Sequence, residues 1–448
     1  MRFTQELVLG IGGARVLAAL GIDPAIWHVN EGHAALSLLE RIRMEGGHSE
    51  TSEAAVRAHT LFTLHTPVPA GNEVFASDVV RRTLDEALPG IATDRMLELG
   101  RSRNGGSDFD LGAMAIRLAA TTNGVSQRHA SVVNNDWGDL IGGGAVGVTN
   151  GVHPQSWIGG AVARILRRVL GPDWPARTIS GGGWEALFDV PDEDLWKAHL
   201  AQKQHMLRDL RSRLRDQYAR HGMSPDGLRR VKDYLPDDRL TIVFARRFAT
   251  YKRANLLFSD PGRLRRLLTD AERPVQIVFA GKAHPADREG QALIRWVVEM
   301  SRTPDLAGHI FFVENYDLGL GASLVQGADV WLNHPRPPRE ASGTSGMKAA
   351  GNGGLNLSVL DGWWLEGFNG KNGWGFGEHE TSDAEDAATL YHLLESEVVP
   401  LFHDREAGVP RAWVRMMKEA MASVIPQFSS HRMVVEYTER FYLPLGRS

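Results

Sequence analysis

The run LTIVFA at residues 240–245 is a short stretch of apolar and β-branched side chains that turns abruptly into the polar segment RRFATYKR at 246–253. A continuous apolar run of this length is typical of a strand buried on both faces, as in a parallel sheet. Segments with helical periodicity separate this run from others like it, so the second half predicts a parallel sheet covered by helices. The other runs are VQIVFAG (275–281), HIFFVEN (309–315), ADVWLN (328–333) and LNLSVL (355–360).

The first half repeats the alternation less regularly, with apolar runs at 25–30, 60–66 and 146–151 and helical patterns at 34–43, 77–88 and 110–122. We therefore expect an α/β fold with two Rossmann-like lobes, the first at 1–150 and the second at 151–448. Leucines and charges at helical spacing predict a long exposed helix at about 190–222, connecting the lobes.

Composition excludes several classes of protein. The chain has 448 residues, of which 43% are hydrophobic and 23% charged, and this is ordinary globular composition. The formal net charge of −4 argues against a nucleic-acid or membrane partner. With no cysteine there is no disulfide and no thiolate metal site, and His28 and His33 are spaced wrongly for a zinc site, so we expect no metal. No signal peptide or membrane-spanning stretch is evident, and a cytoplasmic location is expected.

Polar segments follow each apolar run of the second half. Ligands of open α/β sheets bind beyond the carboxyl ends of the strands, so these segments are the candidate site. In RRFATYKR, Arg246, Arg247, Lys252 and Arg253 suit a phosphate, because arginine supplies a bidentate fork and lysine a point charge. A salt-bridged helix start is an equally acceptable interpretation of the same residues.

Lys348 stands in the small-residue run EASGTSGMKAAGNGG at 340–354. A lysine at the positive end of a helix is electrostatically unfavourable, so we expect a lowered ammonium pKa, and a neutral amine is what Schiff-base chemistry requires. The surrounding amides would hold an anion. Pyridoxal phosphate, an aldehyde that carries a phosphate, meets both demands, although exposed lysines in glycine loops are common.

At this point the sequence resembles a known family. The segment EASGTSGMKAAGNGGLNLSVLDG (340–362) is similar to the cofactor-lysine segment of the α-glucan (glycogen, starch and maltodextrin) phosphorylases, and the resemblance extends along essentially the whole chain. The wording of four further motifs resembles the short bacterial branch: HVNEGHAAL (28–36), TLHTPVPAG (63–71), FARRFATYKRA (244–254) and FAGKAHPAD (279–287).

The resemblance implies the fold and the residue roles. It implies the GT-B arrangement of glycosyltransferases, with the active site in the cleft between two lobes. Lys348 matches the lysine that binds pyridoxal 5'-phosphate as a Schiff base. The other matches are Arg246, Tyr316, Thr344 and Ser345 around the cofactor, Arg247 and Lys252 on the substrate phosphate, and Glu340, Ser342, Gly343, Asn150 and His65 on the glucosyl unit, with His65, Arg247, Lys252 and Lys348 in the catalytic set. Glu31 and His33 match a segment that faces the cleft.

The implied reaction is phosphorolysis of an α-1,4-glucan to glucose 1-phosphate, with proton transfer between the cofactor phosphate and the substrate phosphate. No carboxylate dyad of the glycosidase type is needed. A nucleotide-sugar transferase of the same fold and a non-catalytic glucan-binding remnant stay open as alternatives. A lysine at position 348 argues against the transferase.

The start of the chain, MRFTQELVLGIGG, resembles the interior of family members. We therefore expect the upstream part of the first lobe to be absent, together with a glycine-rich loop that closes over phosphate in the family. The chain alone would then bind cofactor but show little phosphorolysis. Expected assemblies are a homodimer or a complex with the missing lobe.

Overall fold

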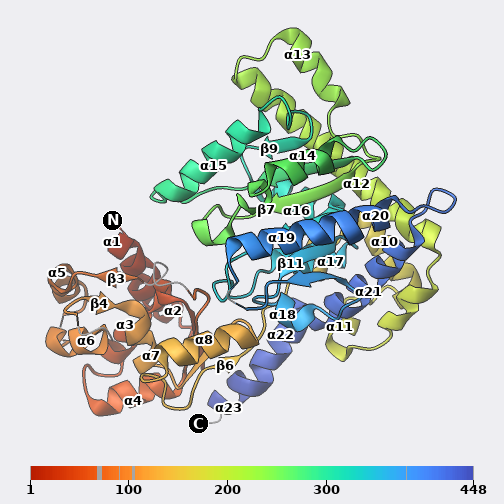
Figure 1. Ribbon diagram of the computed structural model, residues 1–448. Helices are drawn as coiled ribbons and strands as arrows, with labels where there is room; N and C mark the ends of the chain where they lie inside the picture. Colours follow the sequence, from red (N-terminus) through yellow and green to blue (C-terminus); the bar gives the residue numbers. More distant parts are fainter. Residues whose placement is uncertain (1, 68–72, 90, 103–105, 380, 447–448) are drawn as a thin grey trace. The chain divides into compact units, whose positions relative to one another are not determined.

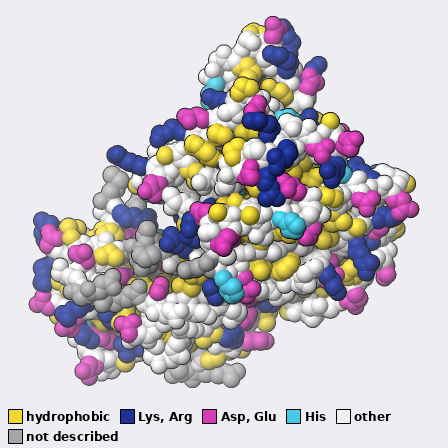
Figure 2. Space-filling model, in the orientation of Figure 1, with side chains coloured by type: hydrophobic (Ala, Val, Ile, Leu, Met, Phe, Trp, Pro, Cys, Tyr) yellow, Lys and Arg dark blue, Asp and Glu magenta, His cyan; other side chains and the backbone are white. Residues whose placement is uncertain are grey.

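A computed structural model of the chain describes residues 2–67, 73–89, 91–102, 106–379 and 381–446. The chain forms two compact units (Figure 1), Met1–Thr149 with Met433–Ser448, and Asn150–Arg432. The predicted second lobe therefore extends too far, because the last stretch of chain packs with unit 1 rather than unit 2. Basic and acidic side chains are interspersed over the visible face (Figure 2), as the small net charge suggests.

Unit 2 is built on a six-stranded, all-parallel sheet with the strand order β12-β11-β10-β7-β8-β9. Each predicted apolar run of the second half contains one of its strands, and the edge strand β12 is an addition that the apolar pattern did not indicate. The strands are β7 (Leu240–Ala245), β8 (Val275–Ala280), β9 (Ile310–Val313), β10 (Val330–Asn333), β11 (Leu355–Val359) and β12 (Gly373–Phe376).

Helices cover both faces of this sheet (Figure 1). In β7, Ile242 and Phe244 face one hydrophobic cluster while Val243 and Ala245 face the other, because successive strand side chains point to opposite faces. Burial on both sides explains the unbroken apolar run. The helices are α9 (Pro154–Trp157), α10 (Gly160–Leu170), α11 (Arg177–Ser180), α12 (Asp192–Arg220), α13 (Pro225–Arg230), α14 (Pro261–Thr269), α15 (Arg288–Ser301), α16 (Leu318–Gly327), α17 (Ser345–Gly351), α18 (Trp364–Gly367), α19 (Asp383–Leu393), α20 (Val399–His403) and α21 (Arg411–Gln427).

The long helix α12 was predicted correctly as a helix but wrongly as an exposed connector. It lies within unit 2 and buries ten side chains, including Met206, Leu207 and Leu210 in the cluster that covers one face of the sheet. The buried side chains also include Lys203 and His199, which a sequence pattern assigns to the solvent face.

Unit 1 has a four-stranded parallel sheet of order β1-β2-β5-β6 and a two-stranded ribbon of β3 and β4. The helical pattern predicted at 110–122 is too long: the helix ends at Arg117 and Thr121–Gly124 forms a strand inside the sheet. The elements are β1 (Trp27–Asn30), β2 (Thr60–Thr63), β3 (Val74–Phe75), β4 (Phe109–Asp110), β5 (Thr121–Gly124), β6 (Val146–Gly147), α1 (Arg2–Leu7), α2 (Gly13–Ala19), α3 (Ser37–Met44), α4 (Glu50–Ala58), α5 (Ser77–Ala87), α6 (Thr93–Leu99), α7 (Leu111–Arg117), α8 (Gln127–Trp137), α22 (Ser430–Tyr437, from Met433 on) and α23 (Leu443–Leu445).

The C-terminal segment joins unit 1 because it covers a sheet face. Tyr437 and Phe441 pack on Leu61 of β2. The Tyr437 hydroxyl accepts a hydrogen bond from Asn123 Nδ2 at 2.9 Å, and the Tyr442 hydroxyl pairs with His28 Nδ1 at 2.8 Å. These aromatic groups bury apolar area and match two polar side chains of the sheet at the same time. Across the described parts of both units, none of the helices combines the length and hydropathy needed to cross a bilayer.

Candidate active site

Three segments of unit 2 leave the same edge of the sheet. They follow β7, β10 and β11, which lie side by side in the sheet. Because the strands are parallel, the residues that come directly after each strand meet at the carboxyl edge, where ligands of such sheets bind. The segments contain RRFATYKR, the loop 334–344, and the short turn at Asp361 and Gly362.

A buried ion cluster lies at this edge. Glu340 Oε2 accepts hydrogen bonds from Lys252 Nζ at 2.5 Å and from Arg246 Nη2 at 3.0 Å. The three side chains are only 6–7% exposed. The structure thus brings together one predicted phosphate cation, one predicted cofactor cation and the predicted sugar contact.

The electrostatics of the cluster follow from burial and from neighbouring charge. Burial lowers the pKa of Lys252 to about 8, and repulsion from Arg246 adds to the effect. Burial alone would raise the pKa of Glu340, but Arg246 and Lys252 hold that pKa below its ordinary value. Arg246 Nη1 is buried and has no hydrogen-bond acceptor within the described residues. The cluster therefore carries unspent capacity to bind an anion.

Arg247 and Tyr316 lie at the rim of the same edge. The Arg247 side chain is exposed, and its charge acts on Lys252 and on Tyr251. Tyr316 follows β9, and its pKa is raised by burial and by Asp317, while the charge of Arg246 opposes the rise. Tyr316 thus stands within electrostatic reach of the cluster.

The backbone around Glu340 is held by groups that sequence reasoning missed. Asp361 Oδ2 accepts the Glu340 amide at 2.9 Å, and Asp361 Oδ1 accepts the Gly362 amide at 2.9 Å. Gly343 has φ 83°, and a Cβ there would stand 3.3 Å from Glu340 Cγ, so glycine is the residue that fits. The Ser342 hydroxyl is buried and has no hydrogen-bond partner among the described residues. The DG pair of LNLSVLDG was the available signal for Asp361.

Arg253 clamps two of these segments together. Its side chain is 3% exposed, and it donates to the carbonyls of His334 and Pro335 at 2.9 Å each while pairing with Asp383 and Asp386. This arginine, which was grouped with the phosphate cations at first, is therefore a structural residue. The salt-bridged interpretation of RRFATYKR is correct for Arg253, whereas Arg246 and Lys252 meet Glu340.

Lys348 lies in the seven-residue helix α17, three residues after Ser345 begins it. Its Nζ stands 3.4 Å from the centroid of the Trp157 ring, and no carboxylate in the described part of the chain pairs with it. Burial lowers the pKa of its ammonium to about 8. The expected direction of the shift is confirmed, but its cause is burial rather than the helix dipole.

The residues next to Lys348 have mixed roles. Thr344 caps α17 through its backbone position without a side-chain hydrogen bond. The Ser345 hydroxyl pairs with Trp331 Nε1 at 3.1 Å, which ties the start of α17 to β10. Trp157, which sequence reasoning overlooked, comes from α9 and covers the lysine.

The predicted sugar contacts of the first half lie elsewhere. His65 follows β2 in unit 1; its amide donates to Glu31 Oε1 and its Nε2 pairs with Asn30 Oδ1 at 2.9 Å. Burial lowers the pKa of His65 and raises that of Glu31. Asn150 is the first residue of unit 2, and its carbonyl accepts from Arg432 at 3.3 Å. Each of these residues is described within its own unit.

Glu31 has a strained backbone, with φ 58° and ψ −180°. A side chain other than glycine in this region costs of order 1–3 kcal/mol, and such strain gathers at functional positions. The strain directs the Glu31 carboxylate to the amide of His65. Residues 68–71 of the motif TLHTPVPAG lie outside the described residues.

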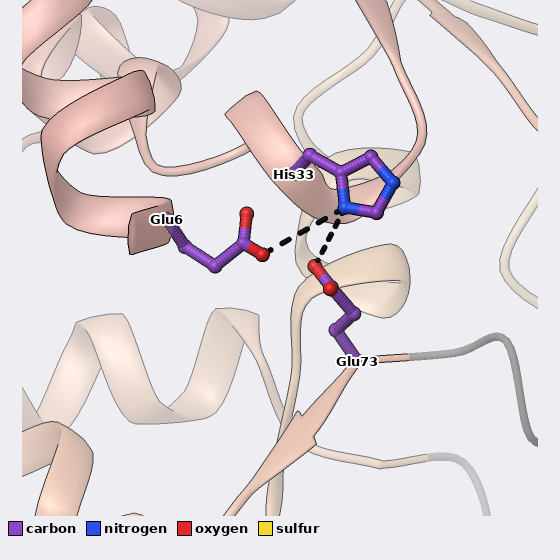
Figure 3. A group of neighbouring side chains, drawn as sticks. All are labelled: Glu6, His33 and Glu73. Carbon is purple, nitrogen blue, oxygen red and sulfur yellow. Dashed lines mark ion pairs between the residues drawn. The ribbon is translucent and has the colours of Figure 1, made fainter. Parts of the chain in front are cut away.

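His33 belongs to a separate ionic group of unit 1 (Figure 3). Its Nδ1 lies 3.7 Å from Glu6 Oε1 and 3.1 Å from Glu73 Oε2. Burial and the nearby Glu73 raise the pKa of Glu6 to about 7. Arg2 binds both carboxylates and meets His33 Nδ1 at 3.0 Å. The guanidinium of Arg2 is therefore the cation of this group.

Comparison with known proteins gives consistent results. A family model for carbohydrate phosphorylases matches residues 23–369. The chain is 43% identical to a maltodextrin phosphorylase of Thermococcus litoralis, 40% to a glycogen phosphorylase of Aquifex aeolicus and 38% to one of Mycobacterium bovis. These matches cover 98%, 99% and 100% of this chain but 53%, 66% and 55% of the respective relatives. The chain thus spans between half and two thirds of their length.

Proposed function

This chain belongs to the carbohydrate phosphorylase family, and on that premise we propose that it acts in phosphorolysis of an α-1,4-glucan. A terminal glucose would pass to inorganic phosphate and leave as glucose 1-phosphate. The two units would form the GT-B arrangement, with the site described above at the edge of unit 2. A nucleotide-sugar transferase is not favoured, since the named relatives are maltodextrin and glycogen phosphorylases.

The observation that carries the proposal is the buried cluster of Arg246, Lys252 and Glu340. Two buried cations share a single carboxylate oxygen, and Arg247 stands beside them. Cations in a site of low dielectric bind a multiply charged anion strongly, because water no longer screens them. Phosphate is the anion of the proposed reaction.

Pyridoxal phosphate is the cofactor that the family implies, and residues of unit 2 fit it. Lys348 offers an amine whose pKa is lowered toward neutrality, and Arg246 Nη1 is a buried donor that lacks an acceptor within the described residues. We propose that Lys348 holds the cofactor and that Arg246, Tyr316, Thr344 and Ser345 surround it. When bound, the group supplies a phosphate that can give and take a proton next to the substrate phosphate.

The chain's own residues would do the rest. Lys252 and Arg247 bind the substrate phosphate and neutralise its charge as the glycosidic bond breaks. Contacts to the glucosyl hydroxyls come from Glu340 and Ser342, with Gly343, Asn150 and His65 completing the set. Trp157 covers Lys348 and shields its amine from water.

The test follows the fate of Lys348. Chain supplied with pyridoxal phosphate should take up the cofactor, and borohydride should fix it to the peptide that contains Lys348. The variant Lys348→Ala should lose this label, whereas Lys371→Ala, at an exposed position of the same unit, should keep it. The loaded chain should bind glucose 1-phosphate. A label on another residue, or none on the folded chain, would contradict the assignment.

A further inference from the structure

Resting on the proposed function, we propose that Glu340 is the resident anion of the phosphate site. In the phosphate-free chain its carboxylate takes the position of a phosphate oxygen between the cations. Phosphate binding displaces it and so delivers Glu340 to the glucosyl unit. One side chain would thereby couple the binding of the two substrates.

The first support is that one carboxylate oxygen serves two cations with different proposed ligands. Glu340 Oε2 is the acceptor of Arg246, assigned to the cofactor phosphate, and of Lys252, assigned to the substrate phosphate. A carboxylate oxygen at 2.5–3.0 Å from both is the geometry that a phosphate oxygen adopts with such donors. Glu340 and a phosphate therefore compete for the same N–H groups.

The second support is the charge balance. Arg246, Arg247 and Lys252 act on one another in this cluster, and Glu340 is the carboxylate bonded to two of them. Cations remain in excess when the neighbouring Asp361 carboxylate is added, whose oxygens accept the amides of Glu340 and Gly362. A phosphate dianion offers more charge and more acceptor oxygens than Glu340, so it can displace the carboxylate.

The third support is that the Glu340 side chain can move while its backbone stays in place. The Glu340 amide is fixed to Asp361, so displacement changes the side-chain rotamer alone. Gly343 leaves room beside it, because its nearest approach is to the Cγ and Oε1 of Glu340. Ser342, with a buried hydroxyl that lacks a partner within the described residues, is close in the chain. A released Glu340 and Ser342 together can meet sugar hydroxyls.

The coupling is reciprocal. If phosphate releases Glu340 to the sugar, then a bound glucosyl unit that holds Glu340 must raise the affinity for phosphate by the same factor. Binding of the two substrates in either order then becomes cooperative.

The decisive measurement is the affinity of the chain, loaded with pyridoxal phosphate, for inorganic phosphate. Glu340→Gln keeps the shape of the side chain and removes its charge, so phosphate should bind at least tenfold more tightly by calorimetry. Glu340→Asp keeps the charge and should stay much closer to the unmodified chain. Glu395→Gln, which breaks a glutamate–arginine pair with Arg263 away from the site, should change nothing.

A thermal melt guards against loss of fold. Without phosphate, Glu340→Gln should melt lower than the unmodified chain, because two buried cations lose their counterion, and phosphate should restore more of its stability. Phosphate affinity that is equal or weaker in Glu340→Gln overturns the proposal while leaving the phosphate site intact. Failure of the unmodified loaded chain to bind phosphate at all would instead remove the proposed function, and this inference with it.

Discussion

Unit 2 buries two lysines in ion clusters, Lys203 under the sheet helix α12 and Lys252 at the carboxyl edge of the sheet, and the two clusters differ in how completely they are matched. Lys203 Nζ donates to Asp329 Oδ2 at 2.5 Å and to the Arg239 carbonyl at 2.7 Å. Asp329 also accepts from the Thr241 amide at 2.8 Å and pairs with His199 Nε2 at 2.7 Å. Here one ammonium meets one carboxylate.

The cluster of Lys252 is matched differently. Two cations share one oxygen of Glu340, a third cation stands nearby, and Arg246 Nη1 has no acceptor within the described residues. A closed cluster of equal charges holds a fold together, whereas a cluster with excess cations is suited to a ligand. The difference is one of balance rather than of burial, because both lysines are buried.

The largest expected effect compares the same substitution at the two lysines. Lys203→Met leaves the buried Asp329 without its cation and should lower the free energy of unfolding by about 3–5 kcal/mol. Lys252→Met leaves Glu340 still paired with Arg246, so the loss should be about 1 kcal/mol or less. Urea denaturation of both variants measures the two values.

Exposed Lys371→Met is the control for this pair and should stay within about 0.5 kcal/mol of the unmodified chain. If Lys252→Met proves as destabilising as Lys203→Met, both clusters are structural and the contrast between them is wrong.

A smaller effect sharpens the comparison from the side of the ligand. Lys252→Ala or Arg247→Ala should weaken phosphate binding by roughly ten- to a hundredfold, since each removes a hydrogen bond between charged groups. The content of pyridoxal phosphate should remain normal. Arg265→Ala, which breaks an exposed pair with Asp305, serves as the control. Unchanged phosphate affinity in both variants would return the segment 246–253 to a purely structural role.

The smallest expected effect is a dependence on pH. Burial and the charge of Arg246 lower the pKa of Lys252 to about 8. Below that pH the ammonium is charged and attracts phosphate; above it the amine is neutral, so the affinity should fall, by at most about tenfold per pH unit.

Sulfate is the better probe for this titration because its own charge stays constant across the range. Lys252→Arg should flatten the curve between pH 7 and 9.5, since arginine does not titrate there. A curve that is flat in the unmodified chain, or that stays steep in Lys252→Arg, would assign the titration to another group.

Much of unit 2 was predictable because strands and helices are local. LTIVFA and VQIVFAG each form a six-residue strand, since burial on both faces requires an unbroken apolar run. The strand Thr121–Gly124 was missed because it has two threonines, an asparagine and a glycine rather than an apolar run. Its place between β2 and β6 is decided by pairing with neighbours.

The candidate site was predictable in part. Resemblance supplied Lys348, Lys252 and Glu340 as separate roles, and the assignment of each role stays a proposal. Neither Asp361 nor Trp157 was singled out as a site residue, because an aspartate after a strand and a tryptophan in a short helix are common features. Their importance follows from what they contact, the amide of Glu340 and the ammonium of Lys348.

The amino-acid sequence by itself determined the α/β class, the run of strands in the second half and the family, because apolar periodicity and motifs are properties of neighbouring residues. The tertiary structure alone decided that Glu340 meets Lys252 and Arg246, which lie 88 and 94 positions away. It likewise decided that Lys203 is buried on Asp329, 126 positions away. The physical reason is that strand order sets these pairings: β10 lies beside β7, and only that arrangement brings charges so distant in the chain to one buried edge.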